Sequence, residues 1–158
     1  MWRNGDIMQD IFDLIDEDEL VDIFSKAVNI PSTNPTGNEK PMCEYVESLL
    51  RQNDIDYFTV PVEKDRYDII AKIKGKSDMD AVVFTGHMDV VPVSDDEMKR
   101  WNTPPFKATI KDGKLYGRGS ADMKSGLMSA IYSMILLKRH NITPSRDIIL
   151  AATIDEEN

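Results

Sequence analysis

The feature that most constrains the fold is an alternation of helix-like and strand-like segments along 158 residues. Apolar residues at spacings of three and four predict helices, and short runs rich in β-branched residues between turn residues predict strands. The expected helices cover residues 7–29, 39–52 and 123–138, and the expected strands cover residues 56–62, 68–73, 81–85 and 147–154, with a hairpin at 107–116 that turns at Asp112-Gly113. This order predicts one α/β domain, a layered and partly parallel sheet with helices on both faces.

Composition excludes several classes of protein. The net charge is −9 and no basic cluster occurs, so we expect no nucleic-acid partner. We find no run of about 18 apolar residues, and the acidic residues 1–22 do not resemble a secretory signal, so we expect no membrane partner. Cys43 is the only cysteine, which excludes an intramolecular disulfide and favours a reducing, cytoplasmic location.

Three polar motifs each follow a predicted strand or hairpin. In the first, His87 and Asp89 follow the strand at 81–85, and their spacing places both side chains on one face of an extended chain. The carboxylate can then hold one imidazole nitrogen while the other nitrogen binds a metal. A purely structural histidine is the alternative interpretation.

The second motif, residues 117–126, lies between the hairpin and the last helix. It superficially resembles a dinucleotide loop, but Asp122 stands where the third glycine belongs and would repel a pyrophosphate. Asp122 can cap the helix, or its two oxygens can bridge two metal ions.

The third motif, Asp155-Glu156-Glu157, follows the strand at 147–154. Neighbouring side chains in an extended chain point apart, so one glutamate can bind a metal while the other holds a water. The alternative is a solvated acidic segment. Together the three motifs supply ligands of the kind that zinc accepts.

Five ordered segments resemble the zinc amidohydrolase and metallopeptidase family that includes acetylornithine deacetylase, succinyl-diaminopimelate desuccinylase, aminoacylase and glutamate carboxypeptidase. The matching segments are Gly86-His87-Met88-Asp89-Val90-Val91-Pro92, then Trp101 with Pro104-Pro105-Phe106, then Asp112-Gly113-Lys114-Leu115-Tyr116-Gly117-Arg118-Gly119, then Ala121-Asp122-Met123-Lys124, and finally Asp155-Glu156-Glu157. The resemblance implies a zinc-peptidase-like fold, with residues 1–158 as the N-terminal part of the catalytic domain.

The resemblance also implies a role for each residue. His87 would bind one Zn²⁺, Asp122 would bridge two Zn²⁺, and Glu157 would bind the second, with Co²⁺ as a substitute. Asp89 would orient His87, and Glu156 would act as general base. The implied substrate is a small N-acylated amino acid or a peptide, and the implied full-length parent is a homodimer.

The sequence departs from the family pattern in several places. Met123 after Asp122 resembles the deacylase and desuccinylase side of the family, and Ser125 stands where many members have glycine. The family completes its site with a later acid and a later histidine, whereas His140, at the end of the last predicted helix, favours a helix C-terminal role. We therefore expect a truncated domain with little activity, or, alternatively, a catalytically dead protein that binds a partner.

Overall fold

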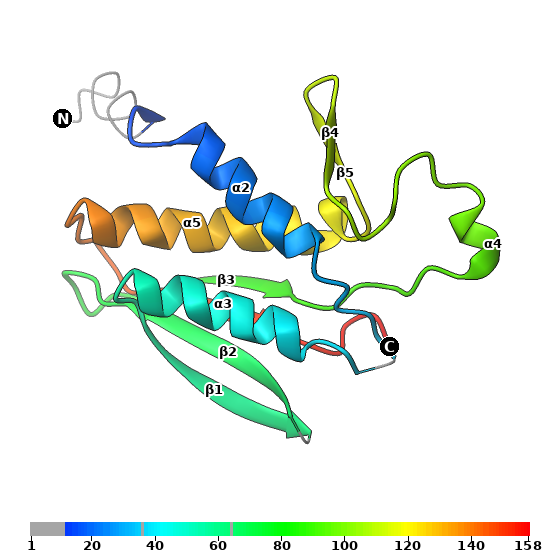
Figure 1. Ribbon diagram of the computed structural model, residues 1–158. Coiled ribbons are helices and arrows are strands. Elements are labelled where there is room, and N and C mark those ends of the chain that lie inside the picture. Colours follow the sequence, from blue (N-terminus) through cyan, green and yellow to red (C-terminus); the bar gives the residue numbers. More distant parts are fainter. Residues whose placement is uncertain (1–11, 36, 64) are drawn as a thin grey trace.

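A mixed four-stranded sheet forms one layer of the molecule, and the longer helices lie on one side of it (Figure 1). The computed structural model describes residues 12–158 apart from residues 36 and 64. The strands run in the order β1-β2-β6-β3, and their bounds are β1 Asp56–Glu63, β2 Arg66–Ile73, β3 Val82–His87 and β6 Ile148–Thr153. β3 and β6 are parallel, and the other pairs are antiparallel. The four predicted strands and the partly parallel sheet are thus confirmed, with bounds shifted by one or two residues.

A separate hairpin, β4 (Thr109–Lys111) with β5 (Lys114–Tyr116), stands apart from this sheet. It turns at Asp112 and Gly113, whose φ angles are +52° and +70°. Two consecutive positive φ angles are what a tight two-residue hairpin turn requires, which is why Asp-Gly predicts it. The predicted hairpin is confirmed.

Three longer helices and one short helix accompany the strands in the described part of the chain. They are α2 Glu17–Val28, α3 Lys40–Gln52, α4 Asp95–Met98 and α5 Ser125–Arg139, with the kinked segment η1 at Ser120–Lys124 just before α5. Residues 7–29 were predicted to form one or two helices, and α2 confirms a helix over 17–28. Residues 13–16 are not helical, and residues 7–11 lie outside the described residues. α4 was not predicted, although Ser94 and Glu97 form a capping box that signals its start.

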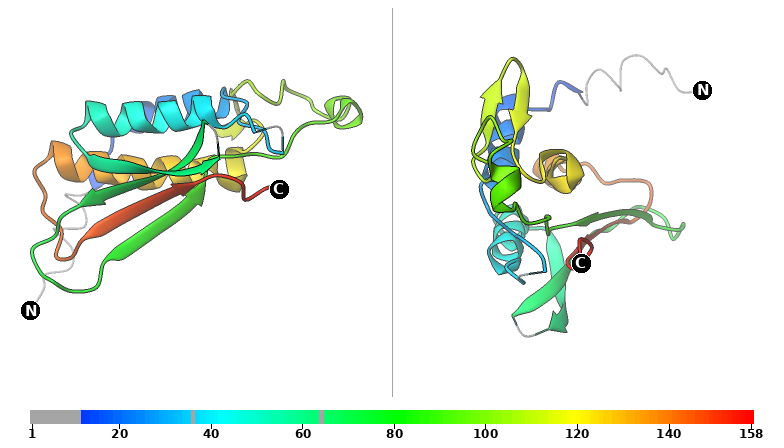
Figure 2. Two further views of the ribbon diagram at one scale, coloured as in Figure 1. Left: turned by 90° about the horizontal axis from the view of Figure 1, so that it is seen from below. Right: turned by 90° about the vertical axis from the view of Figure 1, so that its right-hand side faces the viewer.

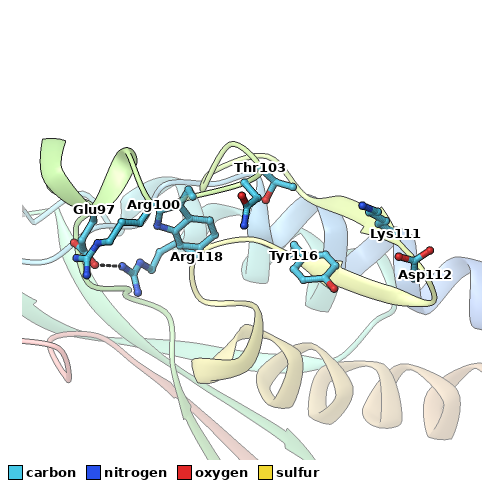
Figure 3. Close-up of a pocket in the computed structure, with 9 residues that line it drawn as sticks. Glu97, Arg100, Thr103, Lys111, Asp112, Tyr116 and Arg118 are labelled. Carbon is cyan, nitrogen blue, oxygen red and sulfur yellow. Dashed lines mark hydrogen bonds and ion pairs between the residues drawn. The ribbon is translucent and has the colours of Figure 1, made fainter.

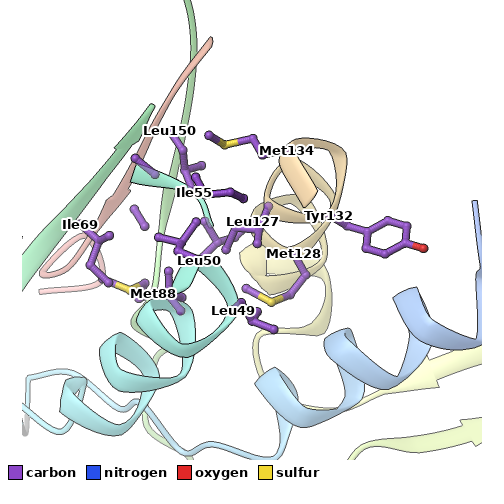
Figure 4. Packing of buried hydrophobic residues seen from close by; sticks show 14 of the residues in the cluster. Leu49, Leu50, Ile55, Ile69, Met88, Leu127, Met128, Tyr132, Met134 and Leu150 are labelled. Carbon is purple, nitrogen blue, oxygen red and sulfur yellow. The ribbon is translucent and has the colours of Figure 1, made fainter. Parts of the chain in front are cut away.

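The core lies between the sheet and α2, α3 and α5, which all cover the same face (Figure 2). Leu50, Leu127 and Leu150, from α3, α5 and β6, are each at most 1% exposed and belong to one apolar cluster (Figure 4). The burial of these apolar side chains is the main contribution to the free energy that stabilises the layered fold.

The opposite face of the sheet is open in the part of the chain that the structure describes. Phe58 and Val83 on that face are 61% and 58% exposed. The α/β class is confirmed, but the described helices cover one face rather than the two that were predicted. The prediction of two covered faces rested on the apolar runs of β3 and β6, which suit burial on both faces. Such a run does not indicate which segment covers each face. No helix among the described residues is both long and apolar enough to cross a bilayer.

Candidate metal centre

The carboxyl ends of β3 and β6 meet at one edge of the sheet. The two strands are parallel, and their register pairs His87 with Thr153. The segments that follow these strands therefore leave the sheet side by side, near the C-terminus in Figure 1. Functional residues gather at such edges in α/β sheets, and the motifs at 87–89 and 155–157 lie there.

The kinked segment before α5 brings Asp122 to the same edge. The segment η1 packs closely on β3 at Gly86, where an added Cβ would lie 2.8 Å from Met123 Cε. Asp122 has the extended dihedrals φ −123° and ψ 101°, its peptide bond to Met123 is cis, and its Oδ1 lies 3.2 Å from His87 Nε2. The N-cap of α5 is Lys124. Asp122 therefore faces His87, and the helix-cap alternative for this residue is wrong.

His87 is held in one orientation by Asp89. His87 Nδ1 lies 3.0 Å from the backbone oxygen of Asp89 and 3.4 Å from Asp89 Oδ1. A carbonyl oxygen only accepts hydrogen bonds, so Nδ1 must carry the proton and donate it. In neutral His87 the Nε2 lone pair then faces Asp122 Oδ1, whereas in protonated His87 the Nε2–H donates to that oxygen. The neutral form is the tautomer that a metal-binding histidine needs when its other nitrogen is hydrogen-bonded.

Glu156 and Glu157 complete the group of ligand-type side chains. Glu156 Oε2 lies 3.6 Å from His87 Nε2. Ligand atoms of His87, Glu156 and Glu157 all lie within 4.8 Å of one another. The backbone N–H of Glu157 donates to Asp89 Oδ2 at 2.9 Å, which ties the third motif to the first.

The charges around His87 favour a cation at this edge. Burial lowers the pKa of His87, but hydrogen bonds to Asp122 and Asp89 and the charges of Asp89 and Glu156 outweigh it, so its pKa lies above the ordinary value. For Glu157 the effect of burial is the opposite, because burial raises the pKa of a carboxyl group. The neighbouring carboxylates raise the pKa of Glu157 further, and the charge of His87 lowers it. Carboxylates crowded around one imidazole repel each other, and a positive charge among them relieves that repulsion.

The donor set fits a divalent metal ion. One imidazole nitrogen and three carboxylates are ligands that Zn²⁺ accepts, and bonds of about 2.0–2.2 Å place the ligands of a tetrahedral ion roughly 3.4 Å apart. The distances of 3.2 Å and 3.6 Å from His87 Nε2 are close to that separation. Asp89 Oδ1 is buried and accepts no hydrogen bond, and it lies 3.4 Å from His87 Nδ1. A positive charge on or bound to His87 would offset the cost of this buried, unpaired carboxylate oxygen.

A cavity of about 830 Å³ lies away from these ligands, between the segment around α4 and the β4–β5 hairpin (Figure 3). Its lining includes Trp101, Tyr116 and Arg118 but none of the four ligand-type residues. The Arg118 guanidinium lies 5.6 Å from the centre of the Trp101 ring and pairs with Glu97 at 3.0 Å. These contacts join the α4 segment to the hairpin.

Comparison with known proteins points to one family. Residues 83–158 match the model of peptidase family M20/M25/M40. The sequence is 40% identical over 144 residues to a probable succinyl-diaminopimelate desuccinylase of Staphylococcus epidermidis, and the alignment covers 91% of this chain and 34% of that protein. The chain is therefore similar to the M20 family, with the match to the family model in residues 83–158. It spans about a third of the length of the curated relatives it matches.

Solved M20-type structures share the fold. Human carnosine dipeptidase 1 superposes with a TM-score of 0.79 at 23% identity, covering 93% of this chain and 34% of that chain. A dinuclear metal-binding M20 peptidase from Bacillus subtilis superposes with a TM-score of 0.58 at 17% identity, covering 85% of this chain and 34% of that chain. The chain therefore has the fold of metallopeptidase catalytic domains.

The structure brings all five predicted site residues to one sheet edge and leaves His140 apart from them. His140 is the C-cap of α5, at the helix end away from Asp122. Sequence reasoning did not single out Asn34 or Arg66, which contact Asp155. Asn34 stood in a segment dense in Pro and Gly, which marked only a loop, and no pattern distinguished Arg66 from a surface arginine.

Proposed function

We propose that His87, Asp122, Glu156 and Glu157 belong to a two-zinc centre that hydrolyses the amide bond of N-acylated amino acids. The observation that carries this proposal is the convergence of one imidazole and three carboxylates from three separate segments. Ligand atoms of three of them lie within 4.8 Å of one another, and Asp122 lies 3.2 Å from the imidazole. The dinuclear site of the Bacillus subtilis M20 peptidase supports two metal ions, and Co²⁺ would be the natural substitute.

Each residue has a role that its surroundings allow. The Asp122 side chain is 82% exposed, so one oxygen can face the His87 metal while the other faces a second ion, which Glu157 would also bind. When bound, the Zn²⁺ pair would polarise the scissile carbonyl and acidify the attacking water. Glu156 would take a proton from that water and give it to the leaving amine, a contribution of roughly 10²–10⁴-fold.

The substrate class follows from the relatives. The 40% identity to a probable succinyl-diaminopimelate desuccinylase supports an N-succinyl amino acid as substrate. Acetylornithine-type deacetylation and general aminoacylase action are the neighbouring possibilities within the same chemistry. We infer that residues 1–158 are the N-terminal part of a catalytic domain, that the whole protein is a homodimer, and that it works in the cytoplasm, which suits the free and buried Cys43.

We also propose that the 158-residue chain alone has little or no hydrolase activity. The sequence contains two histidines, and one of them is the C-cap of α5. One histidine with carboxylates gives an incomplete set for two zinc ions, because each structural or catalytic zinc takes three or four protein ligands.

A protein that binds a partner without catalysis is the second candidate. The exposed apolar side chains of Phe58 and Val83 on the open sheet face favour it, because patches of this kind mark interaction surfaces.

Calorimetric titration with Zn²⁺, paired with an activity assay, tests the metal centre and the predicted inactivity. The chelator-treated chain should bind Zn²⁺, the His87→Ala variant should bind it at least 10-fold more weakly, and neither should hydrolyse N-succinyl or N-acetyl amino acids. Absence of Zn²⁺ binding by the wild-type chain would overturn the metal centre. Metal-dependent hydrolysis by a chain of verified 18.0 kDa mass would overturn the predicted inactivity.

A further inference from the structure

Two side chains far from the ligands in sequence, Asn34 and Arg66, hold the acidic residues that stand next to those ligands. We propose that Asn34 and Arg66 are positioning residues of the metal centre, which fix Asp155 and Asp89 and thereby aim the ligands at a common point. This inference rests on the proposed metal centre and adds residues that the family motifs do not include.

Arg66 is anchored before it reaches the site. Its Nε donates to Glu39 Oε2 at 3.2 Å and its Nη2 donates to Glu39 Oε1, a two-pronged pairing that fixes the plane of the guanidinium. Glu39 is fully buried just before α3, and the Arg66 side chain is 14% exposed. The hydrogen bonds that Arg66 donates to Glu39 and Asp155 raise its pKa, so its charge is permanent. From this fixed position, Nη2 also donates to Asp155 Oδ1 at 2.8 Å.

Asn34 joins two carboxylates that would otherwise repel each other. Its Nδ2 donates to Asp155 Oδ1 at 2.8 Å and to Asp89 Oδ2 at 3.2 Å. An amide nitrogen has two hydrogens, so these two acceptors use its full donor capacity. Asn34 is 1% exposed, and the Asp89 carboxylate is fully buried. Asn34 therefore links the segment that orients His87 to the segment that carries both glutamates.

Asp155 connects Asn34 and Arg66 to the two glutamates that follow it. Its backbone has φ +69°, in the left-handed region that glycine favours and that Asp adopts only as a single residue. The chain turns there, and the next two residues place their carboxylates near His87. The same turn lets the Glu157 N–H donate to Asp89 at 2.9 Å. Loss of the bonds from Arg66 and Asn34 would free this turn to relax.

The other end of the same strand offers a matched control. Asp147 precedes β6, and Lys72 on β2 pairs with it at 2.6 Å. Both ends of β6 thus have an aspartate that is paired with a basic residue of β2. Asp147 also accepts from Gly75 N at 2.8 Å, far along the strand from the ligands.

The test compares Arg66→Gln with Lys72→Gln, and Asn34→Asp with Asp147→Asn. Mutation of residues that support metal ligands typically weakens metal binding 10–100-fold. We expect Arg66→Gln and Asn34→Asp to weaken Zn²⁺ binding by at least about 10-fold and to change the visible absorption spectrum of the Co²⁺-loaded chain. The two control variants should bind Zn²⁺ within about twofold of wild type with an unchanged Co²⁺ spectrum, although they also lose stability.

Amide hydrogen exchange in the metal-free chain gives a second, independent result. The Glu157 amide should exchange at least about 10-fold faster in Arg66→Gln than in Lys72→Gln, because its acceptor geometry depends on the turn at Asp155. Unchanged exchange and unchanged Zn²⁺ affinity in a folded Arg66→Gln chain would overturn the positioning role. If the wild-type chain bound no Zn²⁺, the proposed function would fail, and the exchange comparison would still decide whether Arg66 holds the turn.

Discussion

A methyl group added at Gly119 tests whether the packing beneath the two ligand loops is as tight as the structure indicates. Gly119 has φ +77°, and an added Cβ would lie 2.4 Å from Val90 Cγ1 and 3.4 Å from Lys124 Cδ. Val90 is fully buried and cannot swing away into solvent. The left-handed backbone costs alanine roughly 1–2 kcal/mol, and overpacking adds about 1–3 kcal/mol. Gly119→Ala should therefore lower the free energy of unfolding by about 2–5 kcal/mol.

Gly113→Ala is the matched control for this substitution. Gly113 has φ +70°, and an added Cβ would meet no atom within 4 Å. Only the backbone cost of roughly 1–2 kcal/mol applies there. Urea unfolding, followed by circular dichroism, measures both variants. Equal losses of stability in the two variants would refute the close packing of Gly119 on Val90. A folded Gly119→Ala chain should also bind Zn²⁺ more weakly than Gly113→Ala, because Gly119 and Val90 lie just before and after ligand-bearing segments.

Four further outcomes follow from the structure. Cys43 in the native chain should react with a disulfide reagent at pH 8 at least about 100-fold more slowly than in urea, because burial raises the pKa of its thiol to about 12. Val83→Lys, on the open sheet face, should reduce self-association measured by light scattering, since it removes an exposed apolar side chain. The hydrogen bond from Lys72 holds the pKa of Asp147 at about 2, below its ordinary value of 3.8. The stability that ionised Asp147 contributes is therefore present above pH 3.8 and is lost as the pH falls toward 2. Asp147→Asn should accordingly lower the free energy of unfolding, measured with urea, less at pH 3 than at pH 6. Added Zn²⁺ should stabilise the chain by about 2.7 kcal/mol at a concentration 100-fold above its Kd, and excess chelator should reverse the rise in melting temperature.

The sequence predicts the elements of this fold well where local chemistry decides them. The turn at Asp112-Gly113 depends on two residues that tolerate positive φ, and the strand at 147–154 depends on an uninterrupted apolar run. Coverage of the sheet is not a local property. The sequence of β3 has apolar residues on both faces, and it does not indicate which face a helix covers. The face that carries Val83 is exposed.

His87, Glu156 and Glu157 could be predicted because they end or follow β3 and β6, and parallel strands bring their carboxyl ends together. Asp122 reaches the same edge through the segment before α5. The sequence could not decide between the two roles of Asp122, because an aspartate just before a helix suits both a helix cap and a metal ligand. The kink before α5 decides between them by aiming Asp122 at His87. The support from Asn34 and Arg66 escaped prediction because it joins segments distant in sequence through single hydrogen bonds.

The most direct test of the metal centre is an anomalous difference map from crystals of the Zn²⁺-loaded chain, measured at the zinc absorption edge. We predict an anomalous peak at this sheet edge, bonded to His87 Nε2 and to a carboxylate oxygen of Asp122. A loaded crystal with no peak at this sheet edge, or with Zn²⁺ only at His140 or another surface site, would contradict the assignment of these residues as a metal centre.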